Sequence, residues 1–103
     1  MLILPIKKKW FDMIKSGEKK EEYREIKPYY DSRFKLYEPF LSDFDYVVFR
    51  NGYRKDSPKI KCYCYISKGT GKPEWGAETD KEYYVLKILS LERLNTIWIE
   101  KNL

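Results

Sequence analysis

Residues 60–67 read Ile-Lys-Cys-Tyr-Cys-Tyr-Ile-Ser, an uninterrupted alternation of two kinds of side chain. The even positions carry Ile or Cys, and the odd positions carry Lys, Tyr or Ser. Successive side chains of a strand point to opposite faces of a sheet, so this period of two predicts a half-buried strand. Cys62 and Cys64 then lie on the core face, where a free cysteine behaves as a small hydrophobe.

Further strands are expected on both sides of this segment. Tyr46–Phe49 is a run of aromatic and β-branched residues, and it is followed by Asn51-Gly52, the strongest short turn signal. Residues 83–89 are apolar at nearly every position and predict an interior strand. Residues 69–79 contain three glycines and one proline, and they predict a long loop.

The beginning of the chain predicts a short strand and a helix. Residues 2–4 form the strand, after which Pro5 occupies the first turn of the helix, where its missing N–H costs nothing. Gly17 ends the helix in the left-handed conformation. Apolar residues at i, i+4, i+7 and i+8 mark the buried helical face. They are Ile6, Trp10, Met13 and Ile14.

Residues 21–26 are charged but extended, since a glycine precedes them and Pro28 follows them. A second helix starts at Pro28 and buries one side, formed by Tyr30, Phe34 and either Leu36 or Tyr37. The tail 91–103 has no decisive pattern, although Leu91, Leu94 and Trp98 fit one helical face. Helices followed by several strands predict an α+β fold, a strongly curved sheet or small barrel with helices packed against it. The length favours a single domain over residues 1–103.

Composition narrows the classes of function. The chain has a net charge of +5, and 36% of its residues are charged. Residues 1–37 hold 10 basic against 6 acidic side chains, residues 38–72 hold 7 against 4, and residues 73–103 hold 4 against 6. A basic front of this kind fits a polyanionic partner such as nucleic acid, and it fits a well-solvated surface equally well.

The chain contains no histidine. This excludes Ser-His-Asp and Cys-His catalysis, histidine metal sites and a histidine general base. Two cysteines without histidine do not build a usual zinc site, so we expect no metal and no cofactor. No secretory signal and no apolar run of membrane-spanning length is found. We therefore expect a cytoplasmic protein without membrane contact.

The segment from Gly17 to Arg24 contains the pattern Gly-x-Lys-x-x-Glu-x-Arg. Gly17 ends the helix, and Lys19 lies in the turn that follows. Glu22 and Arg24 are two apart on the next strand, so they point to the same face. If that face lines a cavity, it presents a carboxylate beside a guanidinium, with the Lys19 ammonium at the rim. If it does not, the charges pair on a solvated strand, a contact worth about 0–1 kcal/mol.

This signature, preceded by a helix with a proline at its start, resembles the ASCH domain family, whose members are relatives of the PUA-like RNA-binding barrels. The resemblance covers residues 2–90 and includes two further stretches, Tyr46–Tyr53 and Gly69–Gly76. It implies a small PUA-like β-barrel with helices packed against it. It also implies RNA or a nucleotide as the ligand, in a cleft formed by Gly17, Lys19, Glu22 and Arg24.

The resemblance also implies an alternative, a small hydrolase that uses Lys19 and Glu22. Some small bacterial members of the family are amidohydrolases on acetylated cytidine that use Lys, Thr and Glu, and a few members are reported as ribonucleases. Glu22 stands where the amidohydrolases have threonine, so their hydroxyl nucleophile is missing here. Their glutamate comes from later in the chain, and Glu74 is a candidate for it. A protein-interaction domain with an unused cleft is the third hypothesis.

Four residues outside the signature are candidates for ligand contact. Arg50 and Asn51 lie at a strand end, where a rigid scaffold often holds binding groups, although Asn51 with the next glycine is first of all a turn device. Trp75 either stacks on a base or closes the end of the barrel, and Lys72 beside it is placed to meet a phosphate.

Tyr63 and Tyr65 share the strand face that lies opposite the two cysteines, together with Lys61. Tyrosines alternating with a cation on a strand are typical of aromatic RNA-binding platforms on sheets. The alternative is that both rings are buried under a helix, and this is the arrangement we expect.

Overall fold

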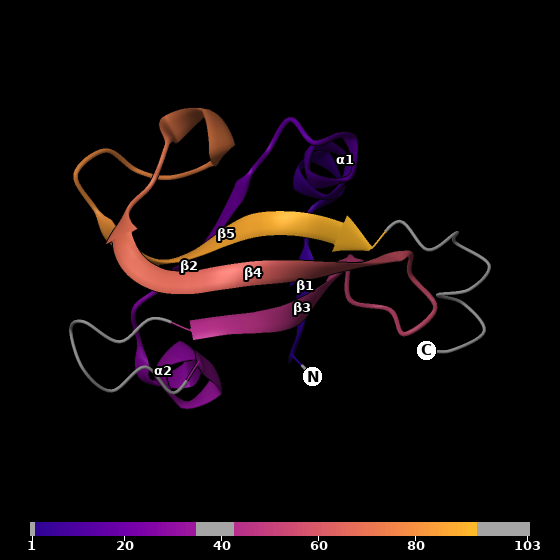
Figure 1. The fold of residues 1–103 in the computed structure, drawn as a ribbon, viewed down its shortest axis with the longest axis horizontal. Coiled ribbons are helices and arrows are strands. Elements are labelled where there is room, and N and C mark those ends of the chain that lie inside the picture. Colours follow the sequence, from indigo (N-terminus) through magenta and orange to yellow (C-terminus); the bar gives the residue numbers. More distant parts are fainter. Residues whose placement is uncertain (1, 35–42, 93–103) are drawn as a thin grey trace.

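The computed structural model describes residues 2–34 and 43–92, which fold into one sheet with helices packed against it (Figure 1). The α+β class expected from the sequence is confirmed. The elements, in chain order, are β1 (Leu2–Ile6), α1 (Lys8–Ser16), β2 (Glu21–Glu25), α2 (Pro28–Phe34), β3 (Asp43–Asn51), β4 (Lys59–Thr70), the 3-10 helix η1 (Pro73–Trp75) and β5 (Glu82–Glu92).

The sheet has the strand order β1-β3-β4-β5-β2. β1 pairs with β3 in parallel, and the other neighbours pair antiparallel. Figure 1 shows β3, β4 and β5 as long strands that run side by side, and β4 bends at its end toward η1. The sheet is therefore a curled half-barrel, and α1 carries the chain from one of its edge strands, β1, to the other, β2.

The period of two in β4 is confirmed, because its residues alternate between buried and half-buried. Cys62 and Cys64 are fully buried in a core that also contains Ile14 of α1 and Phe34 of α2. Both helices therefore cover the cysteine face of the sheet. The expectation that the tyrosines of β4 lie under a helix is wrong, since Tyr63 and Tyr65 are half-buried on the face opposite the cysteines.

Pro5 lies in β1, so the expectation that it begins the first helix is wrong. A strand at the edge of a sheet tolerates a residue without an N–H, and β1 is such an edge. The helix begins at Lys8. Ile6 belongs to β1 and is therefore not part of the helical face. The buried residues of the helix are Phe11, which the predicted face did not include, and Ile14, which it did.

The remaining boundaries agree in part with the sequence. The strand at residues 21–25 and the helix beginning at Pro28 are confirmed. Gly52 has a positive φ of 97° and marks the expected turn, but the connection from β3 to β4 runs over residues 52–58 because β4 begins only after Pro58. β5 extends to Glu92 and so includes the first residues of the tail.

Four residues of the predicted helical faces, Leu36, Tyr37, Leu94 and Trp98, fall outside the described part of the chain. Neither α-helix within residues 2–34 and 43–92 has the length and the apolar composition that crossing a membrane requires.

Candidate functional site

The signature segment folds as helix, turn and strand, as the sequence predicts. Gly17 ends α1 in the left-handed conformation, with a φ of 86°. The N–H of Lys19 then donates to the carbonyl of Met13 at 2.9 Å, which folds the turn back against the helix. β2 follows directly and pairs with β5. Lys19 and Glu22 are both buried as a result.

Glu22 lies between two cations. Its Oε1 is 3.3 Å from Lys19 Nζ, and its Oε2 is 3.0 Å from Arg24 Nη2. The side chain of Lys19 is 0% exposed, that of Glu22 is 9% exposed and that of Arg24 is 13% exposed. The expectation of a rim ammonium is therefore wrong, and so is the alternative of a solvated strand. The turn after Gly17 directs the lysine inward, where it is paired with the Glu22 carboxylate.

Arg24 joins the two edges of the curled sheet. Its Nη2 donates to the carbonyl of Pro5 on β1 at 2.9 Å, and its Nη1 donates to the hydroxyl of Tyr30 on α2 at 3.1 Å. β1 and β2 stand at opposite ends of the strand order, so this side chain spans the opening of the half-barrel. Nε of Arg24 is buried and has no hydrogen-bond partner among the described residues.

The Lys19 ammonium is enclosed by aromatic rings and a backbone oxygen. Its Nζ lies 4.6 Å from the centre of the Trp10 ring and 5.1 Å from that of Tyr23, and it donates to the carbonyl of Trp75 at 2.5 Å. Burial lowers the pKa of Lys19 below its ordinary value of 10.5, while the Glu22 carboxylate raises it in opposition. Lys19 therefore ties α1, β2 and η1 together from the inside.

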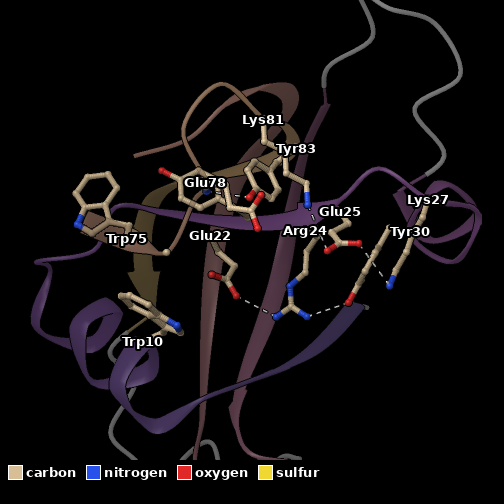
Figure 2. A pocket seen from close by; sticks show the side chains of 12 residues that line it. Trp10, Glu22, Arg24, Glu25, Lys27, Tyr30, Trp75, Glu78, Lys81 and Tyr83 are labelled. Atoms are coloured by element: carbon tan, nitrogen blue, oxygen red, sulfur yellow. Dashed lines mark hydrogen bonds and ion pairs between the residues drawn. The ribbon is translucent and has the colours of Figure 1, made fainter. Parts of the chain in front are cut away.

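A pocket of about 380 Å³ opens beside this ion cluster (Figure 2). Its volume lies at the small end of the range of roughly 300–1,000 Å³ that is usual for ligand sites. Besides Gly76, the wall consists of five aromatic residues (Trp10, Tyr23, Tyr30, Trp75 and Tyr83), three acidic residues (Glu22, Glu25 and Glu78) and three basic residues (Arg24, Lys27 and Lys81). The formal charges of the wall therefore balance.

The pocket has an aromatic end and a charged end. In Figure 2, Trp10 from α1 and Trp75 from η1 lie at one end, and Tyr30 and Lys27 lie at the other. Gly76 has a φ of 100°, and a Cβ there would come within 3.0 Å of Cζ2 of Trp10, so this tryptophan packs directly on the backbone that follows η1. The Glu22–Arg24 pair lies between the two ends.

The structure brings together some of the residues singled out in the sequence. Glu22, Arg24 and Trp75 line the pocket. Lys19 contacts Glu22 from the interior and is not part of the wall, and Gly17 shapes the turn. The other candidates, Arg50, Asn51 and Lys72, are not in the wall.

The candidates outside the wall have local partners. The Arg50 Nε donates to the carbonyl of Gly52 at 3.1 Å, and the N–H of Asn51 donates to the carbonyl of Pro58 at 2.9 Å, so both hold the loop that follows β3. Lys72 Nζ lies 4.7 Å above the Trp75 ring. These three residues are placed to support the scaffold and the loop around Trp75.

Sequence reasoning missed several residues of the wall. The sequence predicts Trp10 on the buried face of the first helix, and Trp10 does pack partly against the core, but it also lines the pocket. Tyr23 and Tyr83 come from neighbouring strands, and their ring centres are 5.6 Å apart. Tyr23 is the only aromatic residue in the charged signature segment, and this isolated position is the one sequence signal for its role in the wall. Nothing local indicates Tyr83, because β5 joins the site only through strand pairing.

Gly71→Ala is expected to destabilise the fold by about 1–3 kcal/mol, because the added methyl overpacks the wall. Its Cβ would lie 2.6 Å from the Cβ of Ala77 and 2.6 Å from Cε1 of Tyr23. The Tyr23 ring is held in place, since its hydroxyl accepts the Lys72 N–H at 2.9 Å. Urea denaturation measures the loss. Gly69→Ala is the matched control, with no atom closer than 3.9 Å to the new Cβ, and an equal loss in both variants would contradict the overpacking.

The cysteines and acidic residues form no further reactive centre in the described residues. Burial raises the pKa of Cys62 and Cys64 well above the ordinary thiol value of 9.0, so both remain protonated and unreactive. Residues 2–34 and 43–92 contain no group of three or more His, Cys, Asp or Glu side chains that could hold a metal ion.

Comparison with known proteins gives no relative from which a role could be transferred. A scan against protein-family models and searches of curated proteins and of solved structures found no match. The contacts, burial and charge of the pocket are therefore the basis on which a function is proposed.

Proposed function

We propose that this chain is an ASCH-type, PUA-like domain that binds RNA or a nucleotide, with one base held in the pocket beside Glu22 and Arg24. The observation that carries the proposal is the convergence of a buried, hydrogen-bonded charge pair with two tryptophans in one small pocket. The cytoplasm is the compartment proposed for this role, because RNA and nucleotides are available there.

The pocket offers both kinds of contact that a base needs. Trp10 and Trp75 present aromatic surfaces for stacking, and stacking tolerates any base because every base has a π face. Between the ends, the Glu22 carboxylate retains acceptor capacity, since each of its oxygens accepts more than one hydrogen bond. The Arg24 guanidinium, which lines the pocket and keeps 13% of its side chain exposed, supplies N–H donors nearby. A base edge that carries both a donor and an acceptor fits this pair.

The charge of the wall favours the base over the phosphate. Three acidic and three basic side chains balance in the wall, so an isolated phosphate gains little net attraction there. The first 72 residues carry 17 basic and 10 acidic side chains, and the four of these that line the wall cancel, so the excess basic charge lies outside the pocket. The proposed arrangement therefore keeps the base in the pocket and the phosphates on the outer, basic surface.

Trp75→Ala is expected to weaken the binding of a single-stranded RNA pool by about 5- to 150-fold, the loss of one stacked base. The variant keeps the Trp75 carbonyl that accepts from Lys19, so the ion cluster stays intact. Fluorescence anisotropy across a salt series measures the affinity, and wild-type binding is expected to weaken as salt rises.

Tyr53→Ala is the matched control for this measurement. Tyr53 is 84% exposed in the loop between β3 and β4, and it takes no part in the pocket. Equal RNA affinities for wild type and both variants would show that the pocket takes no part in RNA binding. If wild type binds neither the RNA pool nor nucleoside monophosphates at low salt, the proposed function is wrong.

A small hydrolase, either a ribonuclease or an amidohydrolase on an acylated nucleoside such as acetylated cytidine, is the second candidate. It is favoured by the lowered pKa of Lys19, since a lysine with a larger neutral fraction is a better general base. It is disfavoured by geometry, because the Lys19 ammonium has no exposed surface and is already bonded to Glu22 and the Trp75 carbonyl. Glu74, the candidate third residue, is exposed on η1. Cleavage or deacetylation that Lys19→Met abolishes without unfolding the protein would establish this alternative.

A further inference from the structure

The face of β3 and β4 that is turned away from the core carries four aromatic rings in mutual contact. We call it the aromatic face, and its members are Phe44, Tyr46, Tyr63 and Tyr65. The centres of the Phe44 and Tyr65 rings are 4.9 Å apart, as are those of Tyr46 and Tyr63. The Phe44 and Tyr63 rings are stacked, with centres 5.9 Å apart. Four rings on two adjacent strands form one continuous surface.

The aromatic face retains solvent exposure although it belongs to the centre of the sheet. Phe44 is 52% exposed and Tyr46 is 39% exposed, while the two tyrosines of β4 are half-buried. The described helices pack on the other side of the sheet, against Cys62 and Cys64. Large rings are usually buried, so a group of exposed rings on a sheet face indicates an interaction surface.

Cations are interleaved with these rings. Lys61 Nζ lies 4.6 Å from the centre of the Tyr46 ring and 3.7 Å from the Glu92 carboxylate. Lys87 on β5 is exposed and stands in register with Tyr65, one strand further across the sheet. The centre of a protein–protein interface is usually depleted in lysine, whereas surfaces that bind single-stranded nucleic acid combine aromatic rings with cations.

The register of the sheet connects the aromatic face with the pocket. Tyr65 is paired with Lys87, and Lys87 is paired with Glu21 on β2. Tyr23, two residues further along β2 and therefore on the same face of the strand as Glu21, lines the pocket. Two strand spacings, about 10 Å in all, separate β4 from β2. A single strand of RNA that crosses β5 at Lys87 therefore meets both surfaces.

We propose that the aromatic face is a second, sequence-tolerant binding surface for single-stranded RNA, on which bases next to the one in the pocket stack. This inference rests on the proposed function, and it extends it from one nucleotide to a short strand. Lys87, between the two surfaces, contacts the phosphate that links them. The surface reads no base edge, because its contacts are stacking and charge.

The test compares a 12-nucleotide RNA of mixed sequence with an equimolar mixture of the four nucleoside monophosphates, using the double variant Tyr46→Thr/Tyr65→Thr. Threonine keeps a high strand propensity, so the sheet is retained, and circular dichroism checks this. The affinity for the 12-mer is expected to fall by about 25-fold or more, which corresponds to about fivefold for each lost stacking ring. The affinity for the monophosphates is expected to stay unchanged. Tyr53→Thr is the matched control, in which neither affinity changes.

Four other outcomes separate this inference from the proposed function. Unchanged 12-mer affinity in the double variant, together with a loss in Trp75→Ala, overturns the aromatic face and leaves the pocket standing. If wild type binds the 12-mer but not the monophosphates, and this binding is lost in the double variant and kept in Trp75→Ala, the result supports the aromatic face and overturns the pocket. Wild type that binds neither probe overturns both. Self-association in sedimentation that the double variant abolishes, with no change in RNA affinity, makes the face an interface between copies and overturns the inference.

Discussion

Glu22→Gln is expected to lower the free energy of unfolding by about 3–5 kcal/mol, the usual cost of removing one partner from a buried ion pair. The substitution leaves the ammonium of Lys19 and the guanidinium of Arg24 without the carboxylate that they share. Two like charges then remain close together and largely removed from water, with no carboxylate between them. Urea denaturation at neutral pH measures the effect.

Glu25→Gln is the matched control, since it is the same substitution on the same strand. The Glu25 carboxylate is 56% exposed, and its ion pairs with Lys27 and Lys81 are 4.0 Å and 3.5 Å long. Such exposed pairs contribute about 0–1 kcal/mol, so this variant stays close to wild type. Similar losses in the two variants would show that burial of Glu22 does not determine its contribution.

A double-mutant cycle isolates the contact with Lys19. If Lys19→Met is combined with Glu22→Gln, one of the two unpaired cations is removed, and the double variant is expected to lose less than the sum of the single losses. Additive losses would indicate that Arg24 alone determines the cost of removing the carboxylate.

Stability is expected to fall by about 2–4 kcal/mol between pH 9 and pH 10.5, because two buried thiols must stay protonated in the folded chain. Burial raises the pKa of Cys62, and it raises that of Cys64 to about 12, against an ordinary 9.0. In this window the folded chain binds more protons than the unfolded chain, so stability decreases with pH by about 1.4 kcal/mol per pH unit for each thiol. Lys19 opposes the fall, since its lowered pKa makes the folded chain bind fewer protons below pH 10.5.

The alkaline loss is measured by urea denaturation from pH 8 to pH 11.5 in the presence of a phosphine reductant. Cys62→Ala/Cys64→Ala is expected to remove the decrease between pH 9 and pH 10.5, whatever its effect at pH 8. Above pH 10 a further decrease is expected from Tyr84, whose pKa is raised to about 12 by burial and by its hydrogen bond to Asp31, and from Tyr23, whose pKa is also raised by burial. Tyr84→Phe removes only the share of Tyr84 in this second part, and an unchanged slope in the cysteine double variant would refute the account.

Much of the fold follows from local patterns in the sequence. The alternation around Cys62 and Cys64 predicts β4 and its buried face, because a strand has a strict period of two. Gly17 predicts the end of α1, since a left-handed residue without a Cβ carries no steric cost. Pro28 predicts the start of α2 because proline fits the first turn of a helix. Each of these signals is decided by neighbours in the chain.

Other features of the fold depend on which strands pair. Pro5 fits the start of a helix and the edge of a sheet equally well, and only the position of β1 at the edge decides between them. The sequence predicts that Tyr63 and Tyr65 lie under a helix, but both described helices pack on the other face, against the apolar residues of the core. Sheet order and helix placement are long-range properties, so a local pattern does not contain them.

The candidate site divides in the same way. The spacing of two between Glu22 and Arg24 placed both side chains on one face, and the sequence by itself determined this pair together with the turn at Gly17. Only the tertiary structure decided that Lys19 is buried, that Arg24 reaches the opposite edge strand at Pro5, and that tryptophans from α1 and η1 border one pocket. The physical reason is the curl of the sheet. Curling brings β1 and β2, the first and last strands of the sheet, within reach of a single guanidinium, and no spacing along the chain encodes that distance.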